Sequence, residues 1–420
     1  MTSAALAQVF LSLAVVVGLA RLGAVLFERL GQPGVVGEIV AGIAAGPSLL
    51  GAAAPGVMDT LIPKSVLPSL QVVAQLGLIV FMLVVGAEVE TIVAGRNARL
   101  IGTVAVSAAV IPFGLGVLLA AGIWPLYRTP PGLIAFLLFI GTALAVTAFP
   151  VLARIVRDRG LAGTTMGTVA LACAAFIDLA AWSVLSVVVS IAGKGGHGWT
   201  PLPLAVAFVL VMLFAVRPLL AWAQRSGRLD RASPQALLVL VLVGAALSAW
   251  YTETIGLHSI FGPFVLGLAL PRHRPTIELI TTRLADTSSA LLLPAFFVIA
   301  GMGVDVPGLD PVDLLVLLGT VVAAAAGKIL ATALPARLCG LGAHDSWTLG
   351  VLLNTRGLTE LVVLSVGLSL GLLHPHLYTI LVVTAVLTTV ATGPLLALLD
   401  SRGAAAADPR PREDAHDDAR

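Results

Sequence analysis

Five ionisable side chains of this 420-residue chain fall inside long apolar runs: Glu38, Asp178, Lys328, Arg356 and Glu360. A charge near the centre of a bilayer costs about 3 kcal/mol or more. Each of the five is therefore expected either to pair with an opposite charge and fix helix packing, or to belong to a functional site.

Asp178, in the stretch AAFIDLAAW, has no opposite charge within a helical turn along the chain. It must find a partner on another segment, or hold a proton part of the time. A buried carboxylate can hold a proton, or release it and hold a cation, but it does not do both at once. Competition of this kind is the minimum machinery for exchanging a cation against a proton, and the sequence predicts such a site at Asp178.

The other charges leave a structural and a functional interpretation open. Arg356 and Glu360 are four residues apart, so they share one helix face and can pair. For this pair and for Lys328, a role in packing and a role in transport fit the sequence equally well. Glu38 lies near the end of its apolar run and can pair with a neighbour.

Two apolar segments have the features of broken helices. In FIGTALAVTAFPVLARIV, Pro150 lacks a backbone donor and frees the carbonyl of Val146, while Thr147 adds a hydroxyl. The second segment, LLNTRGLTELVVLSVG, contains Asn354, Thr355 and Gly357. Unwound carbonyls and half-helix ends form cation sites in transporters. The alternative for the first segment is a simple proline kink.

The composition places these segments in a membrane. The chain is 58% hydrophobic and 11% charged, whereas soluble domains are about a quarter charged. Lipid cannot satisfy open strand edges, so we expect helices throughout. No nucleophile motif, metal-ligand cluster or phosphate loop suggests an enzyme, a cofactor or a nucleic-acid partner. Apolar runs of spanning length predict 13 transmembrane helices, at 5–27, 34–51, 66–87, 100–122, 132–153, 165–192, 200–220, 235–253, 256–271, 288–304, 312–334, 346–372 and 377–399.

Basic residues orient the predicted helices. With the N-terminus outside, the outer connections hold only Lys64, Arg128 and Lys194. The inner connections then hold Arg29, Arg96, Arg99, Arg154, Arg157, Arg159, Arg217, Arg225, Arg228, Arg231, Arg272, Arg274, Arg283 and Arg337. Cytoplasmic loops are rich in Lys and Arg, so we expect an outer N-terminus and a cytoplasmic C-terminus. Adding or removing one helix would place many of these basic residues on the outer side. The asymmetry therefore favours the count of 13.

An internal repeat is predicted seven helices apart. The residues that match in order are Gly37, Gly42, Phe81, Gly86 and Glu90 in one copy and Gly262, Gly267, Phe296, Gly301 and Asp305 in the other. An odd offset gives the copies opposite orientations, as in many transporters. Chance similarity among glycine-rich helices is the alternative. We expect one membrane domain over 1–400, with copies at about 5–192 and 235–399, a linker helix at 200–220 and a disordered tail at 401–420.

Several stretches together resemble the monovalent cation:proton antiporter-2 family, including its plant cation/proton exchangers and their bacterial relatives. They occur in the family's order between about residues 31 and 370: GQPGVVGEIVAGIAAGPSLLG, FPVLARIVRDRGL, AAFIDLAAW, FGPFVLGLALPR, FFVIAGMGVD and NTRGLTELVVLSVG.

The resemblance implies a sodium/proton-antiporter fold with 13 helices, two inverted six-helix repeats and two crossed, discontinuous helices. It implies a homodimer in the inner membrane and an elevator-like cycle that exchanges Na⁺ or K⁺ for H⁺ and serves pH homeostasis. The family's aspartate falls on Asp178, its lysine on Lys328, and its second polar break on Asn354 to Glu360.

One departure from the family pattern affects stoichiometry. The family usually has a polar residue before the aspartate, whereas this chain has Ile177. A single carboxylate predicts one proton per monovalent cation, and hence electroneutral exchange. Lys328 then either faces Asp178 or stabilises the core. The competing hypotheses are a cation channel or uniporter without proton coupling, and a membrane sensor that does not transport.

A weaker signal is the sequence His374-Pro375-His376 between the last two predicted helices. Two histidines can bind a metal or respond to pH near neutrality. A pair separated by proline is more often a turn, and a turn is the interpretation we favour.

Overall fold

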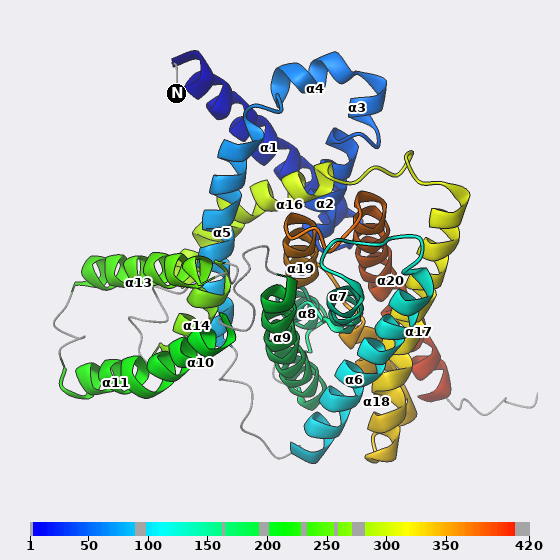
Figure 1. Cartoon of the computed structure of the whole chain (residues 1–420). Helices are drawn as coiled ribbons and strands as arrows, with labels where there is room; N and C mark the ends of the chain where they lie inside the picture. Colours follow the sequence, from blue (N-terminus) through cyan, green and yellow to red (C-terminus); the bar gives the residue numbers. More distant parts are fainter. Residues whose placement is uncertain are drawn as a thin grey trace, which may run out of the picture.

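The structure is a computed structural model that describes residues 3–88, 98–161, 164–192, 201–227, 233–255, 259–270 and 282–407. The regular elements within these ranges are helices (Figure 1). They are α1 (Ser3–Arg29), α2 (Gly34–Ala45), α3 (Leu50–Ala53), α4 (Pro55–Leu61), α5 (Leu67–Glu88), α6 (Ala98–Ile123), α7 (Leu133–Ala145), α8 (Phe149–Asp158), α9 (Thr165–Ala192), α10 (Pro201–Val211), α11 (Arg217–Arg225), α13 (Pro234–Thr254), α14 (Phe261–Ala269), α16 (Leu293–Met302), α17 (Pro311–Leu338), α18 (Ala343–Leu353), α19 (Leu358–Ser369) and α20 (Pro375–Ala407). Two π-helical turns, η2 (Met212–Val216) and η3 (Ser288–Leu292), precede α11 and α16.

Ten helices in the described part of the chain are long and apolar enough to cross a membrane. Among the described residues, the other three predicted ranges hold no single long helix. Residues 132–153 form α7 and α8, residues 346–372 form α18 and α19, and residues 256–271 contain the nine-residue α14. The predicted count of 13 long spans is therefore not reproduced, because two of the predicted spans are interrupted and a third is short.

Part of the predicted disordered tail and one residue of the predicted repeat lie outside the described residues. Helix α20 continues to Ala407, and the remainder of the predicted disordered tail, 408–420, lies outside them. Glu90, which the repeat matched with Asp305, also lies outside them.

The helices form two groups that contact mostly their own members. We call α1, α2, α5, α13, α14 and α16 the scaffold group, and α6–α9 with α17–α20 the crossover group. In Figure 1 the scaffold group occupies the upper and left part of the molecule and the crossover group the centre and right. A large apolar cluster with members such as Ile39, Phe136 and Phe296 joins the two groups.

Four of the glycines matched in the predicted repeat lie where two helices approach closely. Gly42 of α2 packs against α16, which carries Gly301; Gly267 of α14 packs against α5, which carries Gly86. A Cβ atom on any of the four would come within 2.1–2.4 Å of a backbone oxygen of the partner helix. Larger residues are therefore excluded there. In each pair, one helix comes from the first predicted copy and the other from the second.

Candidate functional site: the crossing of two interrupted helices

The interruptions in the two broken helices lie against each other. The first consists of residues 146–148, between α7 and α8, and the second of residues 354–357, between α18 and α19. The backbone N–H of Ala148 donates to the carbonyl of Thr355 at 3.0 Å, and the hydroxyl of Thr147 donates to the carbonyl of Leu353 at 3.0 Å. Both predicted segments are therefore interrupted, and their interruptions contact each other, so the first is not a simple proline kink.

Local sequence explains both interruptions. Pro150 occupies the second position of α8, where its missing N–H is one of the donors without a partner in the helix. Gly357 precedes α19 with φ of +149° and ψ of −120°, a conformation that residues with a Cβ rarely adopt. The bonds between the two breaks satisfy the backbone N–H of Ala148 and the carbonyls of Thr355 and Leu353.

Replacing Gly357 with alanine is expected to destabilise the protein by about 1–3 kcal/mol, because alanine is strained at this φ. Its Cβ would also lie 3.0 Å from a methyl group of Val151. The apparent melting temperature in detergent measures the loss. Gly319→Ala, on an open stretch of α17, is the matched control and should leave stability unchanged or raise it by up to about 1 kcal/mol. Equal stability of the two variants would contradict the role assigned to Gly357.

The side chains of two buried basic residues donate hydrogen bonds to the carbonyls at the end of α7. The Lys328 ammonium donates to the carbonyl of Ala145 and, at 2.9 Å, to that of Ala108 on α6. The Arg356 guanidinium donates to the carbonyls of Ala143 at 3.0 Å and Leu144 at 2.8 Å. The last carbonyls of a helix lack partners and carry its partial negative charge. Lys328 and Arg356 therefore neutralise this half-helix end from within the protein.

Arg356 also pairs with Glu360, as their spacing predicts. Their charged atoms are 2.7 Å apart, and both side chains are almost completely buried. The hydroxyl of Thr389, on α20, accepts the backbone N–H of Arg356 at 3.1 Å and lies 2.8 Å from its carbonyl. Sequence reasoning missed Thr389, although threonines recur along the apolar α20 at Thr384, Thr388, Thr389 and Thr392.

Asp178 lies on α9 and is 1% exposed. Neither of its carboxylate oxygens makes a hydrogen bond within the described part of the chain. The backbone N–H of Phe149, at the start of α8, and the more distant Lys328 are the groups that interact electrostatically with it. Lys328 makes no ion pair with Asp178 within 4 Å, because its ammonium is held at the end of α7. Lys328 thus contacts backbone carbonyls of α6 and α7 instead of the Asp178 carboxylate.

Further polar groups in the crossing lack partners. The carboxamide of Asn354 is buried, and neither its oxygen nor its nitrogen makes a hydrogen bond to a described residue. The carbonyls of Val146 and Thr147 lie between α7 and α8. Neither of them is the acceptor of any backbone hydrogen bond that the described residues make outside the regular helices. A buried polar group without a partner costs about 1–3 kcal/mol. Together with Asp178, these oxygens have the ligand chemistry of an alkali cation site. Glu38 lies apart from them on α2 of the scaffold group and is half-buried.

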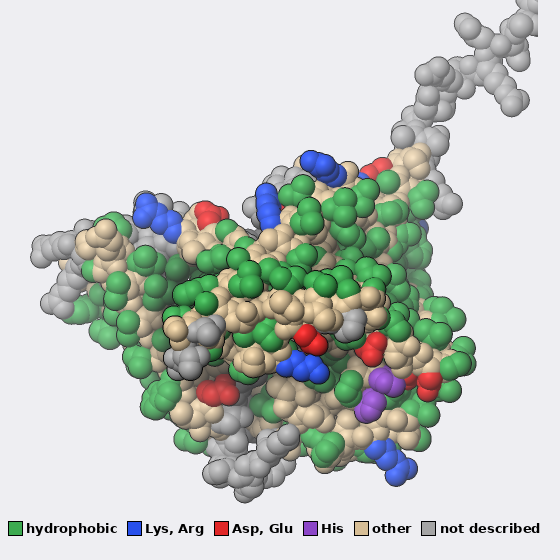
Figure 2. All heavy atoms as spheres, turned by 90° about the horizontal axis from the view of Figure 1, so that it is seen from above, with side chains coloured by type: hydrophobic (Ala, Val, Ile, Leu, Met, Phe, Trp, Pro, Cys, Tyr) green, Lys and Arg blue, Asp and Glu red, His purple; other side chains and the backbone are tan. Residues whose placement is uncertain are grey.

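The two histidines belong to a separate polar cluster. The Nδ1 atom of His376 lies 2.7 Å from a carboxylate oxygen of Asp313, on α17. Tyr127 donates its hydroxyl to the other oxygen, and burial together with this bond raises the pKa of Tyr127 above its usual value. The backbone N–H of His376 donates to the ring of His374, and α20 begins at Pro375, so the predicted turn is replaced by the first turn of this helix. Figure 2 shows two histidine side chains beside acidic ones on a largely hydrophobic face.

Comparisons with known proteins give a consistent result. A family model described as "Sodium/hydrogen exchanger, transmembrane" matches residues 12–399. The Na⁺/H⁺ antiporter NhaS4 of Synechocystis is 36% identical over 91% of this chain and 94% of its own length. Cation/H⁺ antiporter 20 of Arabidopsis thaliana is 38% identical over 91% of this chain but only 47% of its own length. The K⁺/H⁺ antiporter 1 of Saccharomyces cerevisiae is 31% identical, over 89% of this chain and 44% of its own.

The chain therefore spans about half the length of several of these curated relatives. Among solved structures, the sodium proton antiporter MjNhaP1 of Methanocaldococcus jannaschii matches with a TM-score of 0.64. The match covers 95% of this chain and 98% of the other at 19% identity. At that identity the likeness shows a shared fold.

Proposed function

The chain belongs to the sodium/hydrogen exchanger family, as its motifs indicated, and on that premise we propose that it exchanges a monovalent cation for a proton across the membrane. The observation that carries the proposal is Asp178, a buried carboxylate that makes no hydrogen bond to the described residues. It lies on α9, which packs against α7, α8 and α18, the helices that flank the two interruptions. The cation is Na⁺ or K⁺, since similar relatives are named for each.

The chemistry at Asp178 follows from its surroundings. In one state the carboxylate holds a proton, which removes the cost of burying its charge. In the other it is ionised and coordinates the cation, with the carbonyl oxygens of Val146 and Thr147 and the amide oxygen of Asn354 as further ligands. The positive N-terminal end of α8 stabilises the ionised carboxylate after the proton has left and before the cation has bound. One carboxylate thus binds the two substrates alternately.

The crossed helices and the packing of the glycines support an alternating-access cycle. We infer two inverted repeats, because α2 pairs with α16 in the same way that α5 pairs with α14. The crossover group would carry Asp178 past the scaffold group in an elevator-like movement. The two interrupted helices move as a unit in this mechanism, because hydrogen bonds from Lys328, Arg356 and Thr389 connect their segments to each other and to the neighbouring helices.

The remaining proposals concern setting and stoichiometry. The protein is a homodimer in the cell inner membrane, with the N-terminus outside, and serves pH homeostasis. Exchange is electroneutral, because Ile177 precedes Asp178 and the Lys328 ammonium is engaged by two carbonyls instead of by a second carboxylate. One ionisable group then exchanges one proton for one cation.

Transport by purified protein in liposomes with an acid interior tests both points. Adding Na⁺ or K⁺ outside is expected to collapse the pH gradient, while choline has no effect. Clamping the membrane potential at different values should leave the rate unchanged. Cation flux without proton movement would replace the exchanger with a channel. A rate that follows the potential would rule out electroneutral exchange, and silence with every cation would favour a sensor.

A further inference from the structure

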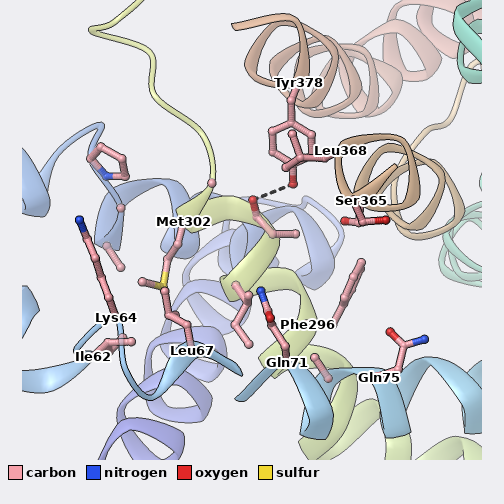
Figure 3. A pocket seen from close by; sticks show the side chains of 18 of the residues that line it. Ile62, Lys64, Leu67, Gln71, Gln75, Phe296, Met302, Ser365, Leu368 and Tyr378 are labelled. Carbon is pink, nitrogen blue, oxygen red and sulfur yellow. Dashed lines mark hydrogen bonds between the residues drawn. The ribbon is translucent and has the colours of Figure 1, made fainter. Parts of the chain in front are cut away.

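A cavity of about 840 Å³ lies at the boundary between the scaffold group and the crossover group. The scaffold group supplies Gln71 and Met302, and the crossover group supplies Ser365 and Tyr378 (Figure 3). Lys64, which precedes α5, also lines the cavity. A space of this size is large enough for many water molecules or a small ligand. The two groups are therefore separated along part of their boundary, and the contacts that remain at its edge hold them together there.

Tyr378 makes such a contact. It lies in the first turn of α20, is 2% exposed, and donates its hydroxyl to the carbonyl of Ala300 on α16 at 2.9 Å (Figure 3). Its ring packs against the backbone at Gly303, where an added Cβ would lie 3.3 Å away. The next residue, Thr379, accepts the backbone N–H of Asp305 at 3.1 Å. The first turn of α20 thus joins the crossover group to the end of α16.

The bond matters because the rest of the cavity boundary is mainly apolar. Contacts between apolar side chains are not directional, so one surface can slide over another with little change in energy. A hydrogen bond is directional, and its donor and acceptor lose stability when they separate without new partners. Ala300 lies in the last turn of α16, and its carbonyl accepts the backbone N–H of Gly303 at 3.2 Å in addition to the Tyr378 hydroxyl.

We propose that the hydrogen bond between Tyr378 and Ala300 is a latch that holds the crossover group against the scaffold group in the state with the open cavity. In each transport cycle this latch opens before the crossover group can move. The inference rests on the alternating-access mechanism proposed above. It makes Tyr378 a residue that controls the balance between states, although it does not touch the ion at Asp178.

Cysteine labelling of the cavity tests the latch without a cation gradient. Gln71, which lines the cavity and is exposed, is replaced with cysteine in a Cys339→Ser background; the other native cysteine, Cys173, is buried. The labelling rate by a polar maleimide in nanodiscs reports how often the cavity is open. Tyr378→Phe removes the hydroxyl and keeps the ring. Loss of one hydrogen bond should lower the labelling rate by about two- to tenfold.

Tyr127→Phe is the matched control. Tyr127 is also buried and also loses one hydrogen bond, but its partner Asp313 lies within the crossover group. A lower labelling rate in Tyr378→Phe alone supports the latch. An unchanged rate, or an equal fall in both variants, overturns it. If the wild type moves no cation and labelling still falls in Tyr378→Phe alone, the proposed exchange has failed and the latch has not.

Discussion

Replacing Asp178 with asparagine is expected to reduce cation-dependent proton movement to the level of protein-free liposomes. Asparagine has nearly the same shape, but it can neither bind and release the proton nor supply a negative charge to the cation. Both oxygens of Asp178 are buried and make no hydrogen bond to the described residues, so none of the hydrogen bonds in the described part of the chain is lost in the substitution. The loss of transport should therefore come without a loss of folding.

The melting temperature of this variant gives a second test. An ionised carboxylate is more costly to bury than a neutral amide. Asp178→Asn should accordingly melt at the same temperature as the wild type or at a higher one. Asp313→Asn is the matched control, because Asp313 is also buried but holds a hydrogen-bonded cluster away from the crossing. It should melt lower and still transport. Exchange that survives in Asp178→Asn would remove Asp178 from the mechanism.

The second large effect is expected at Arg356. Replacing it with leucine removes the donors to the carbonyls of Ala143 and Leu144 and leaves Glu360 buried without its cation. Breaking a buried ion pair on one side typically costs about 3–5 kcal/mol. We expect a large fall in the apparent melting temperature in detergent and a loss of transport, because the two interruptions no longer hold their positions.

A second substitution separates the two causes. In Arg356→Leu/Glu360→Gln the buried carboxylate is neutral, so the part of the loss that comes from the uncompensated charge should be recovered. The part due to the uncapped end of α7 should remain. Coupling between the two sites, measured as the deviation from additivity, is the readout. Strict additivity would mean that the 2.7 Å pair contributes nothing, and that the bonds from Arg356 to α7 account for the whole effect.

The sequence determined the class of this protein and the positions of its breaks. The scarcity of charge required a membrane and therefore helices. Pro150 and Gly357 act on their own turns of backbone, so both interruptions could be predicted locally. The cost of charge in lipid marked Asp178, Lys328 and Arg356 before any contact was known.

Only the tertiary structure decided how these residues are used. Lys328 meets the carbonyl of Ala145 across 183 positions of chain, and Arg356 meets Ala143 across 213. No local pattern encodes such a meeting, because it depends on how whole helices pack. For the same reason, the carbonyls of Ala143, Leu144 and Ala145 at the end of α7 are taken by side chains, whereas the predicted carbonyl of Val146 accepts no backbone hydrogen bond from the described residues. Among the groups that stay unpaired at the crossing are the side chains of Asp178 and Asn354, because packing brings no donor or acceptor of the described chain to either side chain.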